Sequence, residues 1–138
     1  QDPSNPYSGV ISIFLENLLK QKPVIINGGY QTRDFIFVRD IANILNLSMQ
    51  YINQNDCLTF NAGTGISISI GDLLNKLIKL TQSKPEIIVK ELPLGDPKES
   101  SGTYHKMEEF LNINTKSFYN LEDGLLETVK YIKENNLG

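Results

Sequence analysis

Arg33 is the residue of this sequence whose type and position point most directly to chemistry. It belongs to the polar segment Gln31-Thr32-Arg33-Asp34, which lies between the apolar runs at 24–26 and 35–38. A guanidinium group at the mouth of a sheet offers five donors in a fixed planar arrangement, which suits a diphosphate. The same residues are also compatible with a polar hairpin connection that holds a solvated ion pair. In both interpretations the flanking runs must position the arginine.

Other familiar catalytic and metal-binding patterns are missing from the sequence. One cysteine, Cys57, and one histidine, His105, leave no ligand set for a structural zinc. We interpret Cys57 as a small core residue and place His105 at a loop-to-helix junction. No nucleophile elbow, P-loop or dinucleotide-binding glycine fingerprint occurs, and Gly63-Thr64-Gly65 predicts only a turn. The sequence therefore predicts no catalytic residue and no metal ligand.

Composition limits the class of protein. The 138 residues, 40% of them hydrophobic, are enough for one domain with a real core. The net charge of −3, without a run of Lys and Arg, argues against a nucleic-acid partner. No apolar stretch reaches the roughly 20 residues that span a bilayer. We expect a cytoplasmic protein without a membrane partner, and, because residues 1–6 read as the middle of a loop, part of a longer chain.

The elements that position these residues follow from the spacing of apolar side chains. Helices are predicted over 10–20, 40–52, 69–80, 106–111 and 120–132, and strands over 24–26, 35–38, 58–60 and 87–89. Residues 93–102 are predicted to be a loop. Ser69 with Asp72, and Asn120 with Asp123, have the spacing of helix N-terminal caps. This order indicates a mixed α/β or α+β fold with few βαβ units of its own.

The polar segment and its surroundings resemble a known family. Residues 31–41 are similar to the Arg-Asp-Phe-x-x-Val-x-Asp signature of NAD-dependent sugar-nucleotide epimerases and dehydratases, the extended short-chain dehydrogenases. Four further segments resemble that family in order and spacing: residues 1–12, residues 60–65, Gly95-Asp96 with Ser100, Lys106 and Leu111, and residues 121–125 with Thr128. Together these segments cover nearly the whole chain.

The resemblance implies which part of such an enzyme this chain would be. In the family an N-terminal Rossmann domain holds NAD and carries a catalytic Tyr-x-x-x-Lys pair, and neither the glycine fingerprint nor that pair occurs here. Residues 1–138 would then be a mixed α/β substrate-binding lobe that lacks most of the Rossmann sheet. One strand and helix, at about 57–81, would complete the missing domain. NAD would be held by the parent enzyme and not by this chain alone.

The function implied by the resemblance is the nucleotide-sugar-binding C-terminal part of an NAD-dependent UDP-sugar 4-epimerase, with a homodimeric parent. Two alternatives stay open. One is the corresponding part of a sugar-nucleotide 4,6-dehydratase or decarboxylase, and the other is a non-catalytic binding or assembly module. The implied substrate-binding residues are Arg33 at the diphosphate, Ile25 and Asn27 at the nucleobase, Val10 and Ile11 near the nucleotide, and Asp96 in the late loop.

Three departures from the family pattern accompany the resemblance. Pro93 stands where the family usually has a second diphosphate-binding arginine, with Lys98 nearby as a substitute. Losing such a charge-assisted bond would weaken nucleotide binding by roughly 1.5–3 kcal/mol. The turn at 27–31 is about one residue shorter than usual, so Tyr30 would have to replace the aromatic residue that stacks on the base. Asn112 replaces a glycine, a mild change because Asn tolerates the left-handed conformation.

Overall fold

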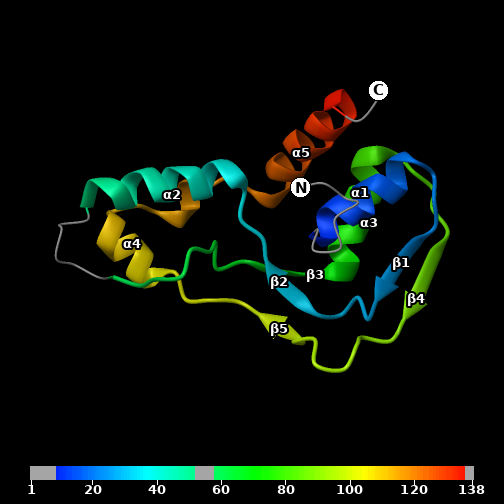
Figure 1. The fold of residues 1–138 in the computed structure, drawn as a ribbon, viewed down its shortest axis with the longest axis horizontal. Coiled ribbons are helices and arrows are strands. Elements are labelled where there is room, and N and C mark those ends of the chain that lie inside the picture. The colour runs from blue at the N-terminus through cyan, green and yellow to red at the C-terminus, as the bar shows by residue number, and fades with distance from the viewer. Residues whose placement is uncertain (1–8, 52–57, 136–138) are drawn as a thin grey trace. The chain divides into compact units, whose positions relative to one another are not determined.

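The computed structural model describes residues 9–51 and 58–135, apart from the side chain of Tyr51. The chain divides into two units, residues 1–31, 69–98 and 125–138, and residues 32–68 and 99–124. In chain order the elements are α1 (Val10–Leu19), β1 (Val24–Asn27), β2 (Thr32–Asp34), α2 (Val38–Tyr51), β3 (Ser67–Ser69), α3 (Ile70–Thr81), β4 (Ile87–Lys90), β5 (Glu99–Ser100), α4 (His105–Leu111), the 3₁₀ turn η1 (Thr115–Ser117) and α5 (Leu121–Asn135) (Figure 1).

The first unit packs two helices beside a two-stranded sheet. Strands β1 and β4 pair in parallel, with Val24 opposite Ile87 and Asn27 opposite Lys90. Helices α1 and α3 lie side by side (Figure 1). Their buried side chains recur at helical spacing, Phe14, Leu15 and Leu18 on α1 and Ile70, Leu73, Leu74 and Leu77 on α3. Each helix therefore turns one apolar stripe inward, as an amphipathic helix does.

The second unit contains a short sheet and a separate helical core. Its sheet has the order β3-β2-β5, and β2 runs parallel to β5 with Arg33 opposite Ser100. Helix α2 packs against α4 through a core of Ile44, Met107 and Leu111. Phe60 and Phe118 pack on this core from the surrounding loops, and Phe110 packs on it from α4. The mixed α/β fold class expected from the sequence is confirmed.

Both predicted helix caps are confirmed. Ser69 Oγ accepts the amide N–H of Asp72 at 3.0 Å and donates to its carboxylate at 2.7 Å. Asn120 Oδ1 accepts the amide N–H of Asp123 at 2.9 Å, and its side-chain NH₂ donates to the Asp123 carboxylate at 2.6 Å. These bonds satisfy N–H groups that the first turns of α3 and α5 cannot pair internally.

The strand predicted over 35–38 is wrong by about three residues. The strand is β2, Thr32–Asp34, and Val38 already begins α2. Ile36 and Phe37 belong to a connecting segment and pack against other parts of the second unit. Phe37 lies against the ring of Tyr119, with centroids 4.7 Å apart, and Ile36 packs on the α2–α4 core. Tertiary burial thus produced a run that resembles a strand.

Three other expectations about strands are corrected. Leu58, Thr59 and Phe60 form no strand, and Phe60 packs on the helical core instead, while Cys57 lies outside the described residues. Strand β3 at 67–69 was not predicted, and the predicted loop at 93–102 includes the two-residue β5. Such short strands exist only through their hydrogen-bond partners, so hydrophobic periodicity does not reveal them.

In the described part of the chain no helix is long and apolar enough to cross a membrane.

Candidate functional site

Arg33 occupies the middle of β2, with β3 and β5 as the neighbouring strands. Its side chain is half-buried, and its Nη1 donates to the carbonyl oxygen of Thr32 at 2.8 Å. Partial burial strengthens the interaction of a guanidinium with an anion because less water screens the charge. The arginine therefore lies on a paired strand, and the polar segment is no simple hairpin connection.

The next residue, Asp34, binds a loop that is distant in sequence. Its Oδ2 accepts the amide N–H of Thr64 at 2.9 Å and that of Gly65 at 2.8 Å, and its Oδ1 accepts the Thr64 hydroxyl at 2.5 Å. A Cβ atom on Gly63 would lie 2.8 Å from Oδ2, so a glycine at 63 leaves room for the carboxylate. Gly65 adopts a φ of +76°, which favours glycine. The sequence indicated this loop only as a turn.

An open cavity adjoins this carboxylate. It measures about 360 Å³ and is lined by Asp34, residues 60–63 and residues 100–102. Ser100, which is paired with Arg33 in the sheet register, contributes to its wall. The second unit thus has a cavity beside β2, the strand that also carries Arg33.

In the first unit, β1 presents the two residues expected at the nucleobase. Val24 and Ile26 are buried, and Ile25 and Asn27 are exposed on the opposite face. The alternation follows from the strand period of two residues. Ile25 and Asn27 are therefore exposed on the same face of β1, as two residues that contact one ligand must be.

Gln31 fixes the turn that follows Asn27, a role that sequence reasoning missed. Its side chain donates to the carbonyl oxygen of Asn27 at 2.7 Å and accepts the amide N–H of Gly29 at 2.7 Å. Gly28 and Gly29 have φ values of +69° and +96°, so the tight turn needs glycine at both positions. The signal that was available in the sequence is a glutamine placed two residues after a double glycine.

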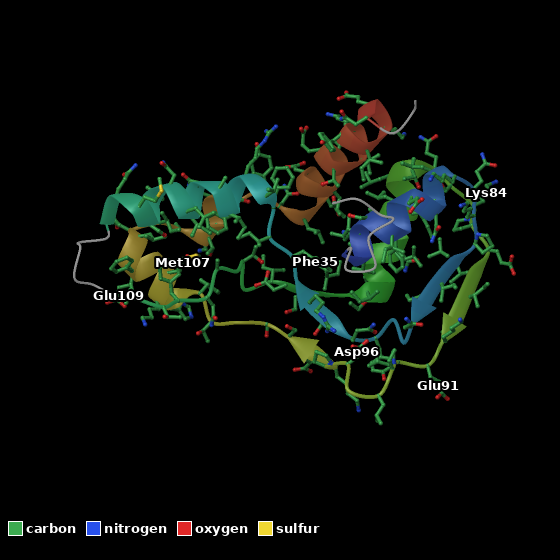
Figure 2. The ribbon with its side chains drawn as sticks, viewed as in Figure 1. Phe35, Lys84, Glu91, Asp96, Met107 and Glu109 are labelled. Atoms are coloured by element: carbon green, nitrogen blue, oxygen red, sulfur yellow. The ribbon has the colours of Figure 1, made fainter. Side chains whose placement is uncertain are left out.

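The remaining predicted site residues also belong to the first unit. Val10 and Ile11 are half-buried at the start of α1. Asp96 is exposed on the loop that follows β4 (Figure 2), where its amide N–H donates to the carbonyl oxygen of Pro93 at 3.1 Å. Arg33, by contrast, belongs to the second unit. The predicted site residues are thus divided between the two units, and the structure gives the local geometry of each residue within its own unit.

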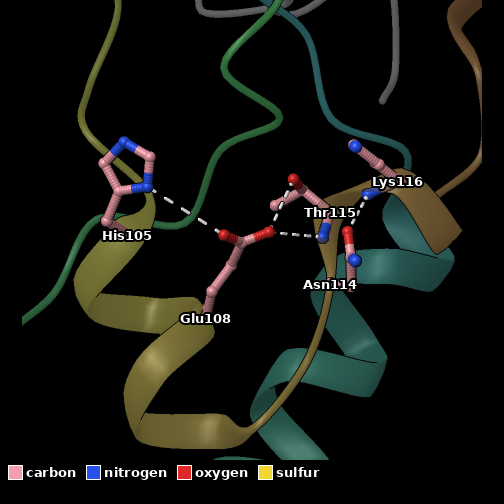
Figure 3. A network of polar contacts seen from close by, with 5 residues as sticks. All are labelled: His105, Glu108, Asn114, Thr115 and Lys116. Carbon is pink, nitrogen blue, oxygen red and sulfur yellow. Dashed lines mark hydrogen bonds and ion pairs between the residues drawn. The ribbon is translucent and has the colours of Figure 1, made fainter.

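A polar network around Glu108 joins α4 to η1 (Figure 3). Glu108 Oε1 accepts the amide N–H of Thr115 at 2.7 Å and its hydroxyl at 2.8 Å, and Oε2 lies 4.0 Å from His105 Nδ1. The bonds from Thr115, reinforced by the charges of His105 and Lys116, lower the pKa of the Glu108 carboxyl below its ordinary value. The network fastens a helix to a turn.

Among residues 9–51 and 58–135, no cluster of three or more His, Cys, Asp and Glu is arranged to hold a metal ion.

Comparisons with known proteins agree with the fold and with the motif around Arg33. The model of the NAD dependent epimerase/dehydratase family matches residues 1–63. A candidate UDP-glucose 4-epimerase of Methanocaldococcus jannaschii is 31% identical over 99% of this chain, which covers 42% of that protein. The dTDP-4-dehydro-6-deoxyglucose reductase of Escherichia coli is 31% identical over 66% of this chain, which covers 31% of that protein.

Solved structures give the same result. The UDP-glucose 4-epimerase of Thermotoga maritima, solved with UDP-glucose, matches 99% of this chain with a TM-score of 0.88 and 33% identity. The UDP-N-acetylglucosamine 4-epimerase of Methanobrevibacter ruminantium, in complex with UDP-N-acetylmuramic acid, matches 97% with a TM-score of 0.82 and 28% identity. In each case this chain covers 42% of the other, and it matches their C-terminal part. The chain is thus similar, over nearly its whole length, to the C-terminal part of UDP-sugar 4-epimerases, and residues 1–63 match the NAD dependent epimerase/dehydratase family model.

Proposed function

We propose that this chain is the nucleotide-sugar-binding C-terminal part of an NAD-dependent UDP-sugar 4-epimerase. The observation that carries the proposal is the match, over 99% of the chain, to the T. maritima enzyme solved with UDP-glucose. The whole activity is assigned to a longer protein because this chain spans less than half of that relative. A homodimeric, cytoplasmic parent completes the proposal.

In this proposal Arg33 holds the diphosphate. The guanidinium carries a permanent charge, presents several N–H donors in one plane, and is steadied by its bond to the Thr32 carbonyl. Ile25 and Asn27 contact the nucleobase from the exposed face of β1, with Ile25 offering apolar surface and Asn27 an amide. Val10, Ile11 and Asp96 are assigned to the same nucleotide. Holding the nucleotide in one pose fixes the sugar for reaction.

The residues of this chain do not fit an NAD site or the catalytic centre. Its sequence contains neither the glycine fingerprint that binds a dinucleotide nor a Tyr-x-x-x-Lys pair. We therefore assign NAD binding and the redox chemistry to the remainder of the enzyme. The role proposed for this chain is to bind and orient the substrate.

The first test is a calorimetric titration of the chain with UDP. We expect binding by the wild-type chain, and a Kd raised by about 10- to 100-fold in Arg33→Ala, because a charge-assisted bond contributes roughly 1.5–3 kcal/mol. Arg39→Ala is the matched control, since Arg39 lies in the same unit but bonds to the Tyr119 hydroxyl. Equal weakening by the two variants would contradict a specific role for Arg33.

A second titration and an assay decide between this function and a related one. The likeness to the dTDP-4-dehydro-6-deoxyglucose reductase favours, as the second candidate, another enzyme that acts on a dTDP-sugar. Tighter binding of dTDP than of UDP would support that candidate. The complete protein should interconvert UDP-sugar 4-epimers with NAD. Failure to do so would overturn the epimerase proposal, and would leave the dehydratase, decarboxylase or binding-module alternatives.

A further inference from the structure

The carboxylate of Asp34 is the centre of the polar contacts around β2. Besides the three short bonds from Thr64 and Gly65, its Oδ1 lies 3.2 Å from the Thr64 amide nitrogen. Hydrogen bonds to an ionised carboxylate are about twice as strong as bonds between neutral groups. This single side chain therefore fastens residues 63–65 to a strand thirty residues earlier in the sequence.

Strand β2 needs such an anchor because it is very short. It consists of three residues, and its register with β5 is defined by two residue pairs, Thr32 with Glu99 and Arg33 with Ser100. A ladder of this length provides few hydrogen bonds against the twisting of the strand. Successive side chains of a strand project to opposite faces, so Asp34 and Arg33 leave β2 in opposite directions. Fixing Asp34 on one face thus limits how far the strand, and Arg33 with it, can rotate.

We propose that Asp34 is a positioning residue, which clamps the Gly63–Gly65 loop to β2 and thereby holds Arg33 in its diphosphate-binding orientation. This inference rests on the function proposed above for Arg33. The glycine at 63 belongs to the same device, because a side chain there would collide with the carboxylate. Thr64 contributes both its amide and its hydroxyl to the clamp.

Two variants test the clamp, and one serves as a control. Asp34→Ala removes every acceptor, whereas Asp34→Asn keeps the shape and one oxygen, so the asparagine variant should retain part of the function. Asp72→Asn is the control, since Asp72 is also a hydrogen-bonded carboxylate, but in the cap of α3. Circular dichroism and thermal melting identify the folded samples. If the alanine variant does not fold, the asparagine variant still gives the comparison with wild type.

The first readout is nuclear magnetic resonance and needs no ligand. In the Asp34 variants we expect amide exchange at Thr64 and Gly65 to be about tenfold faster or more, as the loss of bonds to a charged group implies. We also expect a lower order parameter for the Arg33 Nε–H group. A merely structural role would loosen the loop and leave Arg33 unchanged. An unchanged Arg33 order parameter in folded Asp34→Asn and Asp34→Ala would therefore overturn the proposal.

The second readout is the Kd for UDP. We expect about a tenfold rise in Asp34→Ala, a smaller rise in Asp34→Asn and no change in Asp72→Asn. In an Arg33→Ala background Asp34→Ala should add nothing, because Asp34 acts through Arg33, whereas additive losses would overturn the inference. If wild-type chain and complete protein both fail to bind UDP, the proposed function fails, and the order parameter of Arg33 still decides whether Asp34 positions it.

Discussion

At the scale of single residues, three charged side chains of the second unit have different roles because their partners differ. Arg33 donates to the carbonyl oxygen of Thr32, whereas Asp34 accepts hydrogen bonds from Thr64 and Gly65. Glu108 resembles Asp34 in accepting both the amide and the hydroxyl of a threonine, Thr115. In neither case does the charge of the carboxylate alone indicate a catalytic role. The bonds to backbone N–H groups identify both as residues that hold segments together.

Glu108 gives a prediction about pH. Its pKa is lowered in the folded chain, so the folded state binds this proton less tightly than the unfolded state does. The carboxylate therefore stabilises the fold above its ordinary pKa of 4.5, and this contribution is lost as the pH falls through the lowered value. Wild type should be more stable than Glu108→Gln at neutral pH, and the difference should shrink on acidification.

Urea unfolding at a series of pH values, from about pH 7 to about pH 3, measures this difference. Glu109→Gln is the control, because Glu109 is the exposed neighbour on the same helix and carries the same charge. A stability difference between wild type and Glu108→Gln that does not change with pH would contradict the role assigned to the Thr115 bonds.

At the scale of elements, the chain combines well-formed helices with very short strands. Helices α3 and α5 begin with side-chain caps, and the C-cap residue of α3, Gln82, adopts the left-handed conformation. The C-cap of α4 is Asn112, with φ 50° and ψ 46°, the conformation expected where the family pattern has glycine. The ends of these helices are thus determined by local residues, whereas the strands depend on partners elsewhere in the chain.

The cap of α3 can be tested by Ser69→Ala. The substitution leaves the Asp72 amide without its acceptor and should lower the free energy of unfolding by about 1 kcal/mol. Thermal or urea unfolding measures the effect, with Ser101→Ala at an exposed loop position as the control. If Ser69→Ala and Ser101→Ala have the same stability, the cap contributes nothing measurable to α3.

At the scale of the whole molecule, strand β4 exposes an unusual amount of apolar surface. All four of its residues are exposed, and three of them, Ile87, Ile88 and Val89, are apolar. Within the described residues β4 pairs with β1 alone, so its other edge has no strand beside it. An apolar strand with an open edge is a template for pairing with another chain. We expect the isolated chain to self-associate through β4.

Static light scattering with a charge placed on β4 tests this expectation. Val89→Lys should lower the average molar mass in solution, because a lysine on an edge strand opposes pairing. Val38→Lys is a closely matched control, since Val38 and Val89 are both 68% exposed but Val38 begins helix α2. A monodisperse wild-type monomer, or equal effects of the two lysines, would contradict association through β4.

The sequence by itself determined the helices, their caps, the strands at β1 and β4 and the resemblance to sugar-nucleotide epimerases, because these depend on the periodicity and motifs of neighbouring residues. It also singled out Arg33. Only the tertiary structure decided that the strand is 32–34, and that residues 35–37 pack without strand pairing. It also decided that Asp34 binds residues 64 and 65. These features arise from contacts between segments far apart in the chain. The residues that make each contact show no local periodicity from which the contact could be predicted.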